Sequence, residues 1–69
     1  MKLTRHAPGR YTCTDALGRE WTIVNNPQLG STPWVCYVTD DKNTVLDPLW
    51  TLRETREAIA STVSLDNRR

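Results

Sequence analysis

The 69-residue chain is poor in the residues that build metal sites, disulfide frameworks and phosphate loops. It has two cysteines and one histidine, Cys13, Cys36 and His6, and none of them stands in a close-spaced pair. A structural zinc takes four ligands at short paired spacings, so we expect no metal centre and no cofactor. The three glycines are scattered at positions 9, 18 and 30, which does not match a glycine-rich phosphate loop.

Long apolar runs are missing as well. No stretch approaches the roughly 20 apolar residues that a membrane-spanning helix needs. Residues 1–8 lack the apolar region of a signal peptide. We therefore expect a cytoplasmic protein without a membrane segment, whose cysteines stay reduced. Secretion with a disulfide is the alternative.

The length of the chain limits its stability. A single domain of this size buries only about 60% of the surface that its unfolded form exposes, so its stability is marginal without help. Disulfides, metals or oligomerisation usually supply that help. Since the first two are not expected here, the alternatives are close packing or self-association as a homodimer.

The net charge of +1 hides an uneven distribution. Lys2, Arg5 and Arg10 precede the first acid, Arg68 and Arg69 end the chain, and the interior is faintly acidic. A strong general nucleic-acid binder would carry a basic body instead. We interpret the basic ends as solvated tails.

Three runs dense in β-branched and aromatic residues predict strands over residues 10–14, 19–24 and 34–39. Asp15 and Gly18 suit the first and last positions of a type I turn, which predicts a hairpin between the first two strands. Residues 40–43 read as another turn. We expect three strands, or four if residues 44–46 form a short one before Pro48.

One helix is predicted over residues 52–63. Thr51 at the N-cap and Glu54 three residues later form a capping box, and no glycine or proline follows. Arg53 and Glu57 can pair at i,i+4 on the exposed side. The stripe that can lie across the sheet consists of Leu52, Ile59 and Val63, with Thr55, Ala58 and Thr62 nearby.

These elements predict an α+β domain over residues 10–64. It would contain a three-stranded, or four-stranded, antiparallel sheet packed on one face by a single C-terminal helix. We expect residues 1–9 to be a flexible basic arm, because Pro8-Gly9 interrupts regular structure, and residues 65–69 to be a flexible tail.

Alternation along the strands assigns the bulkier side chains to the core face, namely Tyr11, Cys13, Trp21, Ile23, Trp34, Cys36 and Val38. In a simple meander the two cysteines lie two strand spacings apart, about 9–10 Å, which exceeds the roughly 7 Å limit for a disulfide. We therefore expect two buried free thiols.

The pattern does not predict an enzyme. Nucleophilic catalysis needs a nucleophile, a base within reach and an orienting group. His6 is expected in the arm, while the cysteines are expected in the core. The adjacent acids Asp40 and Asp41 lack the further acids of a calcium-binding loop.

The order of sheet and helix resembles the plant AP2-type domains and the arm-binding domains of tyrosine integrases over residues 10–61. The run at residues 50–59 is similar to their threonine followed by a Glu-Ala helix. The resemblance implies DNA binding by the exposed sheet face and the basic arm, with contacts from Lys2, Arg5, Arg10, Thr12 and Tyr37. Those families line this face with arginine and lysine, whereas here Arg10 stands alone at its edge.

The second half of the chain also resembles small uncharacterised proteins of actinobacteria and their phages. The residues that carry this resemblance are a tryptophan-centred strand and the Thr-Leu-Arg-Glu helix start at residues 51–54. The resemblance implies a phage product that acts on a host protein.

Three tryptophans in so short a chain favour protein binding, because tryptophan and tyrosine are enriched at interface hot spots. We expect Trp21 and Trp34 in the core. Trp50 either packs over the sheet or projects with Leu49 as an anchor, and Val35 and Tyr37 form a second candidate surface. The leading prediction is a non-enzymatic protein that binds a protein partner or itself, and DNA binding is the alternative.

Overall fold

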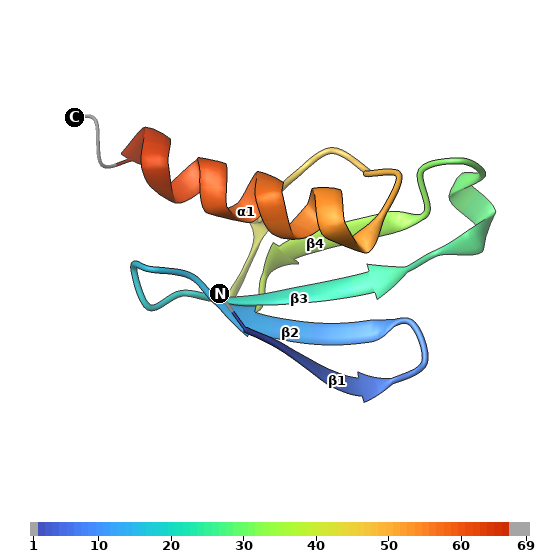
Figure 1. The fold of residues 1–69 in the computed structure, drawn as a ribbon, viewed down its shortest axis with the longest axis horizontal. Coiled ribbons are helices and arrows are strands. Elements are labelled where there is room, and N and C mark those ends of the chain that lie inside the picture. The colour runs from blue at the N-terminus through green and yellow to red at the C-terminus, as the bar shows by residue number, and fades with distance from the viewer. Residues whose placement is uncertain (1, 67–69) are drawn as a thin grey trace.

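The structure is a computed structural model, and it describes the backbone of residues 2–66 and the side chains of residues 2–62. Strands come first and a helix last (Figure 1), in the order β1 (Leu3–Ala7), β2 (Arg10–Thr14), β3 (Glu20–Asn25), η1 (Pro27–Leu29), β4 (Trp34–Val38), β5 (Asp41–Val45) and α1 (Leu52–Asp66). All five strands form one antiparallel sheet in sequence order. The α+β class is confirmed, but the expected three or four strands were too few.

The residues predicted to be a flexible arm form strand β1 instead. Leu3 lies opposite Cys13, and Arg5 lies opposite Tyr11 on β2. Pro8 and Gly9 close the β1–β2 hairpin, with Gly9 at φ +76°, the value that a type II turn requires after a proline. The prediction failed because β1 is mostly polar and exposed, so it lacks the apolar alternation of a recognisable strand.

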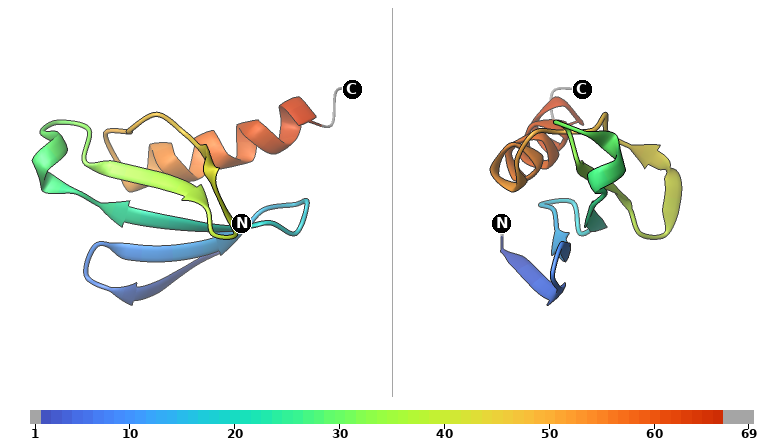
Figure 2. Two further views of the ribbon diagram at one scale, coloured as in Figure 1. Left: turned by 180° about the vertical axis from the view of Figure 1, so that it is seen from behind. Right: turned by 90° about the vertical axis from the view of Figure 1, so that its right-hand side faces the viewer.

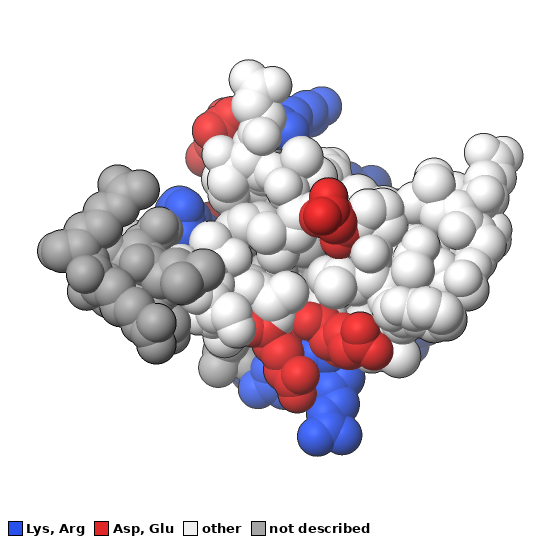
Figure 3. All heavy atoms as spheres, turned by 90° about the horizontal axis from the view of Figure 1, so that it is seen from above, with Lys and Arg blue, Asp and Glu red and all other residues white. Residues whose placement is uncertain are grey.

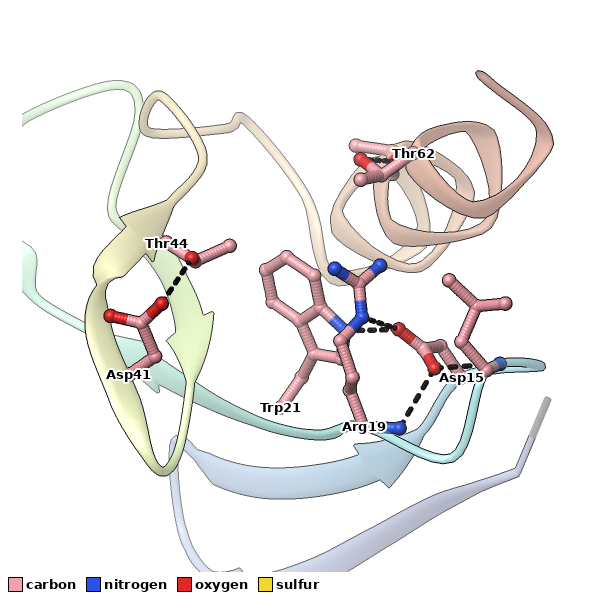
Figure 4. A network of polar contacts seen from close by, with 8 residues as sticks. Asp15, Arg19, Trp21, Asp41, Thr44 and Thr62 are labelled. Carbon is pink, nitrogen blue, oxygen red and sulfur yellow. Dashed lines mark hydrogen bonds and ion pairs between the residues drawn. The ribbon is translucent and has the colours of Figure 1, made fainter. Parts of the chain in front are cut away.

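The last strand also begins earlier than predicted. β5 starts at Asp41 rather than at residue 44, and it pairs irregularly with β4. The Asp41 carboxylate accepts hydrogen bonds from the Asn43 N–H at 3.2 Å and from the Thr44 hydroxyl at 2.7 Å (Figure 4). These local bonds are typical of turns. They explain why the sequence there reads as a turn.

Helix α1 begins where the capping pattern predicts. The Glu54 N–H donates to the Thr51 hydroxyl at 3.1 Å. Thr55 and Ile59 are fully buried, and Leu52 packs against the core, whereas the side chain of Val63 lies outside the described residues. The predicted Arg53–Glu57 ion pair forms at 3.4 Å, but both side chains are exposed, so it adds little stability. Of the predicted tail, residues 65 and 66 continue α1, and residues 67–69 lie outside the description.

The helix covers one face of the sheet, and the core lies between them (Figures 1 and 2). The predicted core face is confirmed: among the described side chains, the buried apolar residues are Cys13, Trp21, Ile23, Cys36, Val38 and Ile59. Tyr11 and Trp34 pack at its margin with ring centroids 6.0 Å apart. No described helix or strand covers the opposite face, which we call the open face.

The β1–β2 turn gives a test of whether β1 belongs to the folded domain. The Gly9 carbonyl accepts the Asn25 N–H at 2.8 Å, and a Cβ added at Gly9 would lie 3.1 Å from the Asn25 Cβ. Gly18 has a similar φ of +83° but open space around it. We expect Gly9→Ala to lower the free energy of unfolding by roughly 2 kcal/mol and Gly18→Ala by about 1 kcal/mol. Urea denaturation measures both, and equal losses would contradict close packing of the turn against β3.

Candidate interaction surfaces

A row of side chains crosses the open face from one edge of the sheet to the other. The strand register places these residues directly opposite one another in the order Thr4, Thr12, Thr22, Tyr37 and Val45. Facing side chains on neighbouring strands have Cβ atoms about 5 Å apart. The row therefore changes from hydroxyl groups on β1–β3 to an aromatic and an apolar residue on β4 and β5.

The hydroxyl half of the open face is hollow. The hollow has a volume of about 790 Å³, within the usual size of a ligand site, and its lining includes Lys2, Thr4, His6, Arg10, Thr12, Thr14, Glu20, Thr22 and Thr39. Two bonds order its floor: His6 Nε2 lies 2.7 Å from the Thr12 hydroxyl, and the Thr22 and Thr39 hydroxyls are 2.7 Å apart. Most of the lining residues are polar, with Ala7 and Cys13 as the exceptions, so the hollow suits a polar or charged ligand.

The structure brings together most of the residues predicted to contact nucleic acid. Lys2, Arg10 and Thr12 line the hollow, and Tyr37 lies beside it in the row. Arg5 is separated from them, because its register partner Tyr11 belongs to the opposite, helix-covered side of the sheet. The sequence prediction missed His6. Alternation from Lys2 through Thr4 to His6 was the available signal, but it has meaning only once these residues are known to form a strand.

An apolar patch adjoins the hollow on the same face. Val24 lies opposite Val35, and Tyr37 lies opposite Val45, whose side chain is exposed. Val35 and Tyr37, both predicted to bind a partner, are partly buried in this patch. The open face therefore has a polar half and an apolar half.

The two residues predicted to anchor a partner together are placed differently. Leu49 pairs with Trp34 through backbone hydrogen bonds of 2.9 and 3.1 Å, and its side chain packs against the core. Trp50 is 61% exposed. It projects from the surface rather than packing over the sheet, and the pinned Leu49 fixes the backbone from which it projects.

An uncharged lobe lies next to Trp50. The lobe is the loop of residues 26–33 between β3 and β4, and no charged residue occurs anywhere from residue 21 to residue 39. Its base is closed by the Asn26 N–H, which donates to the Pro33 carbonyl at 2.6 Å, directly before Trp34. Figure 3 shows the lobe as the uncharged right-hand end of the molecule. Leu29 is 41% exposed on it.

The buried carboxylate of Asp15 has a structural role. It accepts hydrogen bonds from the Leu17 and Arg19 N–H groups, from Arg19 Nε at 2.8 Å and from Trp21 Nε1 at 2.9 Å (Figure 4). The Arg19 guanidinium also lies 5.7 Å from the centre of the Trp21 ring. Burial by itself would raise the pKa of Asp15, but these hydrogen bonds outweigh it and hold that pKa below its usual value. The carboxylate is thus kept ionised and fixes the turn that Asp15 and Gly18 were predicted to form.

The two cysteines are buried and free, as predicted. Cys13 lies opposite Trp21 and Cys36 opposite Ile23, so β3 separates the strands that carry them. Burial raises the pKa of the Cys36 thiol to about 11 and also raises that of Cys13. At neutral pH both groups are protonated thiols, which are poor nucleophiles.

The described part of the chain has neither a candidate metal cluster nor a candidate membrane-spanning helix. Among the described side chains, those of residues 2–62, no group of three or more histidine, cysteine or acidic residues could hold a metal ion. Over residues 2–66, no helix has the length and apolar character needed to cross a bilayer.

Comparisons with protein-family models, curated proteins and solved structures find no match to this chain.

The Asp15 network predicts a stability loss on neutralisation of its charge. Asp15→Asn keeps the size of the side chain but removes the charge and points an amide donor at existing donors. We expect the free energy of unfolding to fall by about 2 kcal/mol. Asp47→Asn, at an exposed acid, is the matched control and should change stability little. Similar losses in both variants would show that the network does not stabilise the fold.

The same network predicts an acid-dependent stability. The pKa of Asp15 is lower in the folded protein than in the unfolded chain, where it is about 3.9. The stabilisation is therefore complete above the unfolded value and is lost as the pH falls through the lower, folded value. Urea titrations at a series of acidic pH values should show a decrease in wild type that is smaller in Asp15→Asn. Parallel curves for the two proteins would refute this assignment.

The thiols give a third prediction. In the folded protein both cysteines should react slowly with an aromatic disulfide reagent near neutral pH, and both should react at once in denaturant. Mass spectrometry of the untreated protein should find no intramolecular disulfide. Fast labelling of either thiol without denaturant would mean that the core opens readily.

Proposed function

We propose that this protein is a small, non-enzymatic interaction protein that binds a protein partner or a second copy of itself through the surface around Trp50. The observation that carries the proposal is the 61% exposure of Trp50, in a chain whose other two tryptophans pack in or against the core. The resemblance of the second half to phage proteins favours a host protein as the partner.

Burial of Trp50 in an interface would remove a large apolar surface from contact with water. At about 25 cal/mol per Å², covering the exposed part of a tryptophan contributes roughly 2–4 kcal/mol to binding. The backbone before it is already fixed, because Leu49 is hydrogen-bonded to Trp34 on both sides. A pre-positioned anchor loses less conformational entropy on binding than a mobile one.

The uncharged lobe supports a protein partner at the same place. Interface cores are depleted of charged residues and enriched in aromatic ones, because burying an unpaired charge is costly. The lobe offers an exposed Leu29 and no charges, and it meets Trp34 where Leu49 pairs with it. The non-enzymatic part of the proposal is supported by the structural placement of Asp15 and the raised pKa values of the thiols.

A pair of surface variants tests the proposal. Trp50→Ala should remain folded, since its side chain is mostly exposed, and should lose partner binding or self-association. Leu17→Ala is the matched control: Leu17 is also exposed, at 49%, but it lies in the β2–β3 turn. Sedimentation velocity over a range of concentrations measures self-association. Quantitative cross-linking to host proteins, followed by calorimetry with each purified candidate, measures binding to a partner.

The variants also define the result that would overturn the proposal. If Trp50→Ala retains every partner and the same sedimentation behaviour as wild type, Trp50 is not the anchor. If Leu17→Ala and Trp50→Ala weaken binding equally, the effect is a general loss of apolar surface rather than a specific contact.

A further inference from the structure

The function proposed above, binding through Trp50, gives no role to the hollow of the open face. Its two nearest cations stand at opposite ends. Arg10 begins β2, and Thr14 ends it. Because Leu3 lies opposite Cys13 on the antiparallel strand, the preceding residue Lys2 lies beside Thr14. Arg10 and Thr14 are four positions apart along an extended strand, a distance of roughly 13 Å. This spacing suits successive anionic groups along an extended chain better than one small anion.

Hydroxyl groups line the floor between the two cations. Thr4, Thr12 and Thr22 stand side by side across β1, β2 and β3. The exposed Thr4 hydroxyl can donate a hydrogen bond to an anionic oxygen, whereas Thr22 is only 4% exposed and its hydroxyl is already hydrogen-bonded to Thr39. His6 adds a ring nitrogen beside Thr12. The acid of the lining is Glu20, which accepts a hydrogen bond from the Thr39 hydroxyl at 3.4 Å. The described lining thus has two formal positive charges and one negative charge.

An aromatic residue, Tyr37, is the register neighbour of the lining residue Thr22 on the side away from β1, although it does not itself line the hollow. Tyr37 lies directly opposite Thr22, and it is partly exposed on the open face. Phosphate groups are bound by cations and hydroxyls, whereas nucleobases stack on aromatic side chains. The two cations lie beside β1 and on β2, and the ring lies on β4, across Thr22 of β3.

We propose that the hollow binds a short segment of single-stranded nucleic acid, with phosphates between Lys2 and Arg10 and a base stacked on Tyr37. The concave shape favours a single strand over a duplex. A sheet that reads duplex DNA has to protrude into the major groove, about 12 Å wide and 8.5 Å deep, and a hollow cannot fill that groove. This site lies on the open face and does not depend on the role of Trp50.

The direct test is a fluorescence-anisotropy titration of wild type with a labelled oligothymidylate. The competing ligands are a duplex of the same length and inorganic polyphosphate. We expect the single strand to bind most tightly. With two phosphate contacts, its affinity should fall about sevenfold between 50 mM and 200 mM salt. Absence of binding at the lower salt concentration, or tighter binding of the duplex, would overturn the proposal.

A matched pair of charge reversals locates the site. Arg10→Glu and Arg5→Glu make the same change in net charge on neighbouring strands, but Arg10 lines the hollow and Arg5 lies on the other side of the sheet. Arg10→Glu should weaken binding severalfold and make the salt slope less negative by about 0.7, as expected for one lost phosphate contact. Arg5→Glu should bind nearly as wild type does. Equal effects would mean a general electrostatic attraction and would refute the site.

The aromatic contact distinguishes a nucleotide from a bare chain of phosphates. Tyr37→Leu keeps an apolar side chain but removes the ring, and it should weaken oligothymidylate binding about tenfold while leaving polyphosphate binding unchanged. Tyr37→Phe should restore binding. If Tyr37→Leu has no effect, or if polyphosphate competes as well as the oligonucleotide, the base contact is absent and the assignment fails. Amide NMR spectra of each variant check that it is folded. Trp50→Ala should bind the oligonucleotide as wild type does, because Trp50 does not belong to this site.

Discussion

The hydrogen bond from the Trp21 indole to the Asp15 carboxylate is the interaction on which the rest of the structure depends. Trp21 is fully buried at the centre of the sheet, and its N–H needs an acceptor there. Asp15 supplies it from the turn between β2 and β3, and the same carboxylate binds Arg19 and holds that turn closed. The bond therefore joins the core to the hairpin around which the meander is built.

The second constraint is that one helix can cover only one face of a sheet. α1 buries Ile59 and Thr55 against the core face, where the described buried apolar residues gather. The open face is left with threonines, two cations and a small apolar patch. Trp50 lies outside the core and remains exposed, because the residue that pairs with Trp34 is Leu49 and not Trp50. Both proposed binding surfaces are consequences of this limited coverage.

Local signals were enough to predict much of the fold. The capping residues Thr51 and Glu54 located the start of α1, and alternation around Trp21 and Cys36 assigned the core face correctly. The failures have a common cause. β1 and β5 lie at the edges of the sheet and are largely exposed, so their sequences carry little hydrophobic pattern, and pairing with a neighbour is what makes them strands.

The sequence by itself determined the class of fold, the helix start, the hairpin turn at Asp15 and the burial of both cysteines, because each depends on residues close together in the chain or on simple alternation. Only the tertiary structure decided which residues share a surface. It placed Lys2 and Arg10 around one hollow with Tyr37 beside it, and it set Arg5 on the opposite side. It also decided that Trp50 projects while Leu49 is partly buried and packs against the core. These outcomes depend on strand register, and a shift of one residue moves every side chain of a strand to the other face.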